Sequence, residues 1–73
     1  MAIRREQLDK MYQEYLSGMR REGRKGAMNE PLTKVEWTAE FQFVSEEVLG
    51  ERPFYSNTEL RRVNSMMVKS SRR

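Results

Sequence analysis

Six apolar residues near the start of the chain recur at the spacing of one face of an α-helix. They are Leu8, Met11, Tyr12, Tyr15, Leu16 and Met19. Because an α-helix turns once in about 3.6 residues, this spacing places all six on one stripe. The pattern predicts a helix over residues 3–21 that ends near Gly23. Within it, Gly18 indicates either a frayed last turn or the close approach of another backbone.

Two patterns conflict in residues 32–50. Polar and apolar residues alternate without a break over residues 34–43, as they do in a half-buried strand. Thr33 and Glu36, however, have the spacing of a capping box, and Gly50 stands where a helix commonly ends. A lone strand also needs a partner strand. We therefore favour a helix over residues 34–49, and the alternative is a short strand or hairpin over residues 34–43.

If residues 34–49 are helical, apolar side chains lie on two opposite sides of the helix. One side carries Trp37, Phe41, Val44 and Val48, and the other carries Val35, Ala39 and Phe43. Glutamates form an acidic stripe beside them. This pattern is typical of a central helix that is covered on both flanks.

The last third of the chain begins with a second capping-box pair, Ser56 and Glu59, followed by an apolar stripe of Leu60, Val63 and Met67. A helix over residues 57–68 follows from these signals. The fold class is thus all-α: a single small three-helix domain over residues 1–73, with a flexible basic linker over residues 20–32 and a disordered basic C-terminal tail over residues 69–73. The alternative is an α+β fold that uses the strand or hairpin at residues 34–43.

Composition argues against catalysis, metal binding and membrane insertion. The chain has no cysteine and no histidine, which removes thiolate and imidazole metal ligands and the usual nucleophilic triads. It also lacks a Gly-rich phosphate loop, an apolar run of about 20 residues and the apolar core of a signal peptide. We expect a cytoplasmic protein, in the host cytoplasm if a phage encodes it, that is not an enzyme and holds no cofactor or metal.

Charge is distributed unevenly along the chain. Residues 1–25 carry seven basic and four acidic side chains, residues 26–59 carry two and seven, and residues 60–73 carry five and none. Basic ends therefore flank an acidic middle. This polarity can steer association with phosphates or with an acidic protein surface.

The turn and paired arginines of residues 50–63 invite a comparison with the DNA-reading helix-turn-helix. In that motif, apolar residues stand six and nine positions after the turn glycine. Counted from Gly50, these positions are the polar Ser56 and Glu59. A standard helix-turn-helix is disfavoured, and only a variant with a lengthened turn remains.

Protein binding is the preferred function, and direct binding of DNA or RNA is the alternative. A chain this short with six methionines leaves apolar surface for a partner or for self-association. Basic and aromatic side chains near Gly23 and after Gly50 suit an interface or a phosphate backbone. The candidate partner-binding residues are Arg20, Arg21, Arg24, Lys25, Phe54, Tyr55, Arg61, Arg62 and Met66.

As a whole, the chain resembles the small, cysteine-free, charge-rich regulators that bacteriophages make to redirect host transcription. The stretches that carry the resemblance are "RREGRKG" and "RPFYSNTELRR". The resemblance implies a non-enzymatic protein that docks on bacterial RNA polymerase, interferes with σ-dependent initiation by steric hindrance and alters termination. The competing expectation is a DNA- or RNA-binding regulator that uses a variant helix-turn-helix and the basic tail.

Overall fold

Three α-helices make up most of the chain that the structure describes. The structure is a computed structural model that describes residues 3–24, 26 and 30–70. The helices are α1 (Arg5–Arg24), α2 (Lys34–Leu49) and α3 (Asn57–Ser70), and the described residues include no strand. The all-α prediction is confirmed. The strand or hairpin at residues 34–43 is wrong, because these residues lie within α2.

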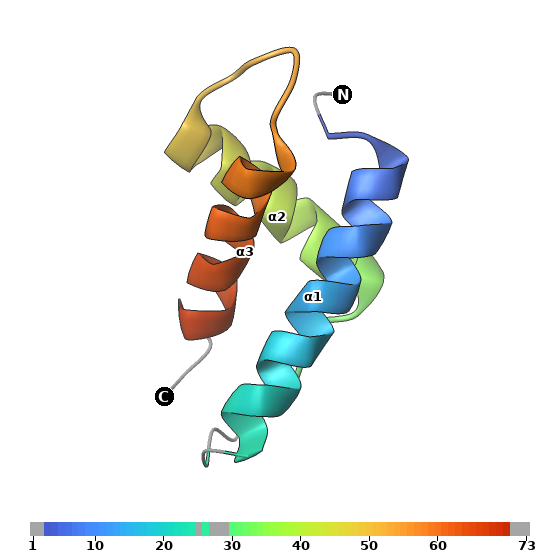
Figure 1. The fold of residues 1–73 in the computed structure, drawn as a ribbon, viewed down its shortest axis with the longest axis vertical. Helices are drawn as coiled ribbons and strands as arrows, with labels where there is room; N and C mark the ends of the chain where they lie inside the picture. Colours follow the sequence, from blue (N-terminus) through green and yellow to red (C-terminus); the bar gives the residue numbers. More distant parts are fainter. Residues whose placement is uncertain (1–2, 25, 27–29, 71–73) are drawn as a thin grey trace.

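The helices are arranged so that α1 and α3 run in the same general direction, while α2 runs the opposite way and crosses them (Figure 1). Contacts between α1 and α3 are the most extensive of the three helix pairs. They include a close approach at Gly18, where an added Cβ would lie 3.0 Å from Val68 Cγ2. The lack of a side chain at Gly18 therefore makes room for α3, and the helix does not fray there. The neighbour is the Val68 side chain and not a backbone.

Capping interactions explain why residues 34–49 form a helix despite their alternating pattern. The Glu36 N–H donates to the Thr33 hydroxyl at 3.3 Å, and Thr33 N donates back to the Glu36 carboxylate at 3.1 Å. At the other end Gly50 has a φ of 83°, and its N–H donates to Glu46 O at 2.9 Å. The helix thus starts and stops where the two local signals predict.

The end of α1 corrects one boundary. The helix continues to Arg24, so Arg20 and Arg21 are helical and are not part of a flexible linker. The glycine with a positive φ is Gly26, at 99°, and its N–H donates to Gly23 O at 3.1 Å. The turn that follows α1 needs a positive φ, which glycine adopts without strain, and Gly26 supplies it. Gly23 lies inside the helix. Lys25 lies outside the described residues.

The end of α3 corrects a second boundary. The helix continues through Lys69 to Ser70, and the Ser70 hydroxyl donates to Met67 O at 3.0 Å. These two residues therefore belong to the helix and not to a disordered tail. Residues 71–73, the rest of the predicted tail, lie outside the described part of the chain.

The core lies where α2 meets α1 and α3. Trp37 and Phe41 are fully buried, and their rings stack with centroids 4.6 Å apart. Tyr12 packs against Trp37 with a centroid distance of 5.3 Å. The buried apolar residues are Ile3, Met11, Tyr15, Met19, Trp37, Phe41, Tyr55, Leu60, Val63 and Met67.

A buried asparagine joins the three helices. Asn64, on α3, is 4% exposed. Its Nδ2 donates to Met11 O of α1 at 2.7 Å, and its Oδ1 accepts a hydrogen bond from Trp37 Nε1 of α2 at 3.3 Å. The same amide thus satisfies the indole N–H and fixes α3 against α1. Buried polar groups are tolerated when they are paired in this way.

Replacement of Asn64 tests this link. Asn64→Ala leaves the buried Trp37 N–H without its acceptor, so we expect the free energy of unfolding to fall by about 2–4 kcal/mol. The matched control is Ser45→Ala. Ser45 is also fully buried, but its Oγ makes no hydrogen bond, so its removal should cost less than about 1 kcal/mol. Urea denaturation of both variants measures the difference, and equal losses would contradict the role of Asn64.

Candidate partner-binding surfaces

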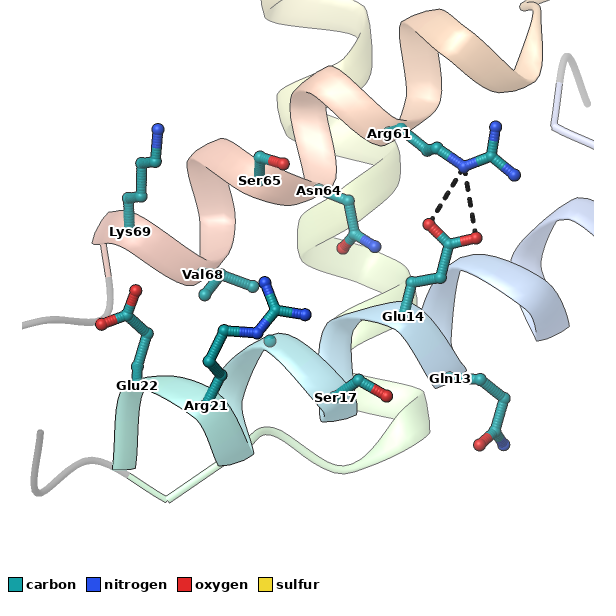
Figure 2. A pocket seen from close by; sticks show the side chains of 11 residues that line it. Gln13, Glu14, Ser17, Arg21, Glu22, Arg61, Asn64, Ser65, Val68 and Lys69 are labelled. Atoms are coloured by element: carbon teal, nitrogen blue, oxygen red, sulfur yellow. Dashed lines mark hydrogen bonds and ion pairs between the residues drawn. The ribbon is translucent and has the colours of Figure 1, made fainter. Parts of the chain in front are cut away.

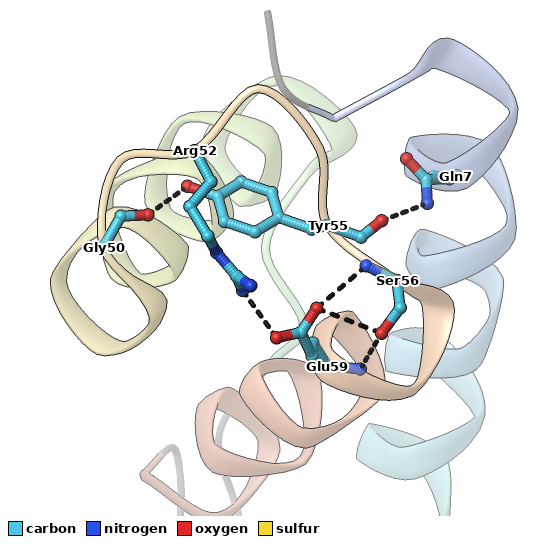
Figure 3. Close-up of polar contacts among 6 residues, drawn as sticks. All are labelled: Gln7, Gly50, Arg52, Tyr55, Ser56 and Glu59. Carbon is cyan, nitrogen blue, oxygen red and sulfur yellow. Dashed lines mark hydrogen bonds and ion pairs between the residues drawn. The ribbon is translucent and has the colours of Figure 1, made fainter.

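The connection between α2 and α3 is a structural corner in which most polar groups are already paired (Figure 3). Tyr55 is 1% exposed, and its hydroxyl donates to Gly50 O at 2.6 Å. Gln7 Nε2 of α1 donates to Tyr55 O at 3.0 Å. Tyr55 therefore closes the core, and its prediction as a partner-binding residue is wrong, because long-range packing buries the ring.

Glu59 holds this corner together electrostatically. Its carboxylate accepts from Ser56 N at 3.0 Å and from Arg52 Nη2 at 2.6 Å. The backbone N–H of Ser56, followed by the Arg52 guanidinium, lowers the pKa of Glu59 from 4.5 to about 2. Arg52 also lies over the Tyr55 ring, with Cζ 5.0 Å from the centroid. The predicted capping box is confirmed, and Arg52 is engaged within the protein.

Phe54 is exposed, unlike the adjacent Tyr55. Its ring is 53% exposed, and the Arg4 guanidinium lies above it with Cζ 5.6 Å from the centroid. The contact with Arg4 places Phe54 beside the start of α1, at the end of the molecule opposite to the end of α1 (Figure 1). Phe54 is available to a partner, but it is remote from Arg20 and Arg24.

A groove of about 410 Å³ separates the exposed edges of α1 and α3 (Figure 2). Its lining includes three cations, Arg21, Arg61 and Lys69. Glu14 lines the same groove and accepts from Arg61 Nε at 3.1 Å. The groove is therefore a mixed-charge surface, and it brings together two of the predicted residues, Arg21 and Arg61.

The predicted residues thus do not form one surface. Arg20, Arg21 and Arg24 lie at the end of α1. The connection between α2 and α3, which carries Phe54, lies near the opposite end of the molecule (Figure 1). On α3 the exposed residues Arg62, Met66 and Lys69 follow one another at helical spacing. Because α1 and α3 run in the same direction (Figure 1), Arg21 and Lys69 line the same groove.

A third surface was not among the predicted sites. We call it the α2 outer face, and it consists of Val35, Glu36, Ala39, Glu40, Phe43 and Glu47. All six residues are exposed, with Val35 at 82% and Phe43 at 61%. The sequence already placed the apolar residues of this face opposite Trp37 and Phe41 and predicted cover on both flanks of the helix. That prediction of cover is wrong for this flank, because the described residues leave Val35 and Phe43 largely exposed.

The described residues contain no group of three or more acidic side chains placed to hold a metal ion. None of the described helices combines the length and hydropathy needed to cross a bilayer.

Comparisons with known proteins do not place the chain in a family. No protein-family model, no curated protein and no solved structure matches it.

The pH dependence of stability tests the role of Glu59. Because the pKa of Glu59 is lowered from 4.5 to about 2 on folding, its stabilising contribution is present above pH 4.5 and is lost as the pH falls towards 2. Asp9 acts in the same direction, since its hydrogen bond with Lys34 lowers its pKa. We expect Glu59→Gln to lower the midpoint of thermal unfolding at pH 7, and the difference from the wild type to shrink by pH 2. A constant difference across this range would contradict the argument.

Proposed function

We propose that this protein is a non-enzymatic regulator that acts by binding a larger protein assembly. The observation that carries the proposal is the α2 outer face, on which Val35 and Phe43 remain largely exposed. A small domain has limited apolar surface to bury, and this one leaves two large apolar side chains on a single helix face. Apolar residues grouped in this way, with charged residues beside them, are typical of an interface.

Bacterial RNA polymerase is the first partner to test. The chain's resemblance to phage-encoded transcription regulators favours polymerase, and the small size and charge of the protein are compatible with such a role. The proposed mechanism is steric: the bound protein occupies a site on polymerase that a σ factor or another regulator needs. It requires surface contact alone and no catalytic residue.

Retention of purified bacterial RNA polymerase on the immobilised protein tests the proposal. We expect the wild type to retain polymerase and Phe43→Ser to weaken retention by about tenfold, because loss of a central aromatic anchor commonly costs 1–2 kcal/mol or more. Phe54→Ser is the matched control, since it removes an exposed aromatic ring from a different surface. A wild-type protein that retains no polymerase would reject this partner, and equal behaviour of the two variants would reject the α2 outer face.

Direct nucleic-acid binding is the second candidate function, and it is favoured by the basic ends of α1 and α3. Arg21 and Arg24 occupy the last turn of α1, and Lys69 occupies the last turn of α3. Lysine and arginine in these positions also stabilise the helix dipoles, which is a structural reason for their presence. Their position at the same end of the molecule nevertheless provides a compact set of phosphate-binding cations.

Salt dependence distinguishes this candidate from protein binding. If the basic ends bind a short DNA duplex or RNA, the logarithm of affinity should fall linearly with the logarithm of salt concentration. Arg62→Glu combined with Lys69→Glu should reduce the magnitude of this log–log slope by roughly two. Arg5→Glu combined with Lys10→Glu changes the net charge equally on exposed positions of α1 and is the control. Fluorescence anisotropy measures the affinity of both double variants at each salt concentration. Absence of binding by the wild type at low salt would reject direct nucleic-acid binding.

A further inference from the structure

The sequence of α2 is suited to a helix with neighbours on two sides, yet the described chain covers only one. Trp37, Phe41 and Ser45 form the buried side, packed against α1 and α3. On the other side Val35 and Phe43 are exposed, with the small Ala39 between them. These three residues recur every fourth position, so they form one stripe about 12 Å long, given a rise of 1.5 Å per residue. The described residues leave this side of α2 largely uncovered.

The charge beside this stripe specifies what kind of neighbour fits. Glu36, Glu40 and Glu47 lie along one edge of it by helical spacing, and Glu46 lies near its other edge. The single basic residue of α2, Lys34, pairs with Asp9 of α1. An exposed apolar stripe with an acidic border complements an apolar surface that has a basic border.

The acidic border also disfavours two other occupants. In a symmetric dimer through this face, the glutamates of one copy would lie beside those of the other, and like charges at an interface are unfavourable. A nucleic acid would bring phosphates towards the same carboxylates, which repel them. The occupant that remains is a protein segment with positive charge.

We propose that the α2 outer face binds a basic amphipathic helix of a partner protein. Apolar residues of that helix pack on Val35, Ala39 and Phe43, and its lysines or arginines pair with Glu40 and Glu47. Helices pack by interdigitating rows of side chains spaced three or four residues apart, and the stripe on α2 is such a row. This inference rests on the proposed protein-binding function and adds the chemistry of the partner element.

A pair of synthetic peptides tests the inference with the full chain. The first is a helical 18-residue peptide with a leucine stripe bordered by lysine and arginine. The second has the same leucine stripe bordered by glutamate. We expect the basic peptide to bind at least tenfold more tightly than the acidic one in fluorescence anisotropy. In NMR titration, the largest backbone amide shifts should come from α2 residues of the outer face.

Charge reversal provides the matched variants. Glu40→Lys combined with Glu47→Lys should weaken binding of the basic peptide by tenfold or more and strengthen binding of the acidic peptide. Glu6→Lys reverses a charge at an exposed position of α1, away from the face, and should change affinity less than threefold. Glu36 is left intact because it belongs to the Thr33 capping box. Thermal unfolding of each variant confirms that the fold is retained.

Three outcomes would overturn the inference: no binding of the basic peptide, equal binding of both peptides, or amide shifts centred on the groove between α1 and α3. Its failure is distinguishable from failure of the proposed function. If Phe43→Ser still weakens polymerase retention while neither peptide binds, the α2 outer face binds protein but not a basic helix. If the basic peptide binds and polymerase does not, the partner chemistry holds and polymerase is the wrong partner.

Discussion

Burial of the Trp37 indole is the interaction on which the rest of the fold depends. The ring is fully buried, stacks on Phe41 and contacts Tyr12, so it joins α2 to α1. Its N–H cannot remain unpaired in such a site without a free-energy cost. Asn64 of α3 accepts that hydrogen bond and donates to Met11 O of α1. One aromatic residue and one amide thereby set the positions of all three helices.

Because the core lies on one side of α2, the described residues leave the other side of this helix largely uncovered. In this protein the described residues leave Val35 and Phe43 exposed beside a row of glutamates. The exposed stripe is therefore a consequence of how the core is built, and it provides the strongest physical reason to expect a protein partner.

The charges of the protein divide into those used for stability and those left on the surface. Lys34 pairs with Asp9 and Arg52 pairs with Glu59 at the surface, and Arg61 pairs with Glu14. Other charges face outward and are segregated: glutamates follow α2, while arginines and a lysine gather at the ends of α1 and α3. This separation arises because α1 and α3 run in the same direction (Figure 1).

The sequence by itself determined the first and third helices and both capping boxes, because these features depend on neighbours within one or two helical turns. For residues 34–49 the local signals conflicted: the alternation over residues 34–43 fitted a strand, and the capping signals favoured the helix that the structure has. Only the tertiary structure decided that Tyr55 is buried, that Asn64 bridges the core and that Phe54 lies far from Arg24. It also decided that one side of α2 stays exposed. Each of these results depends on contacts between residues far apart in the chain, such as Gln7 with Tyr55, and local sequence patterns carry no information about which distant segment packs where.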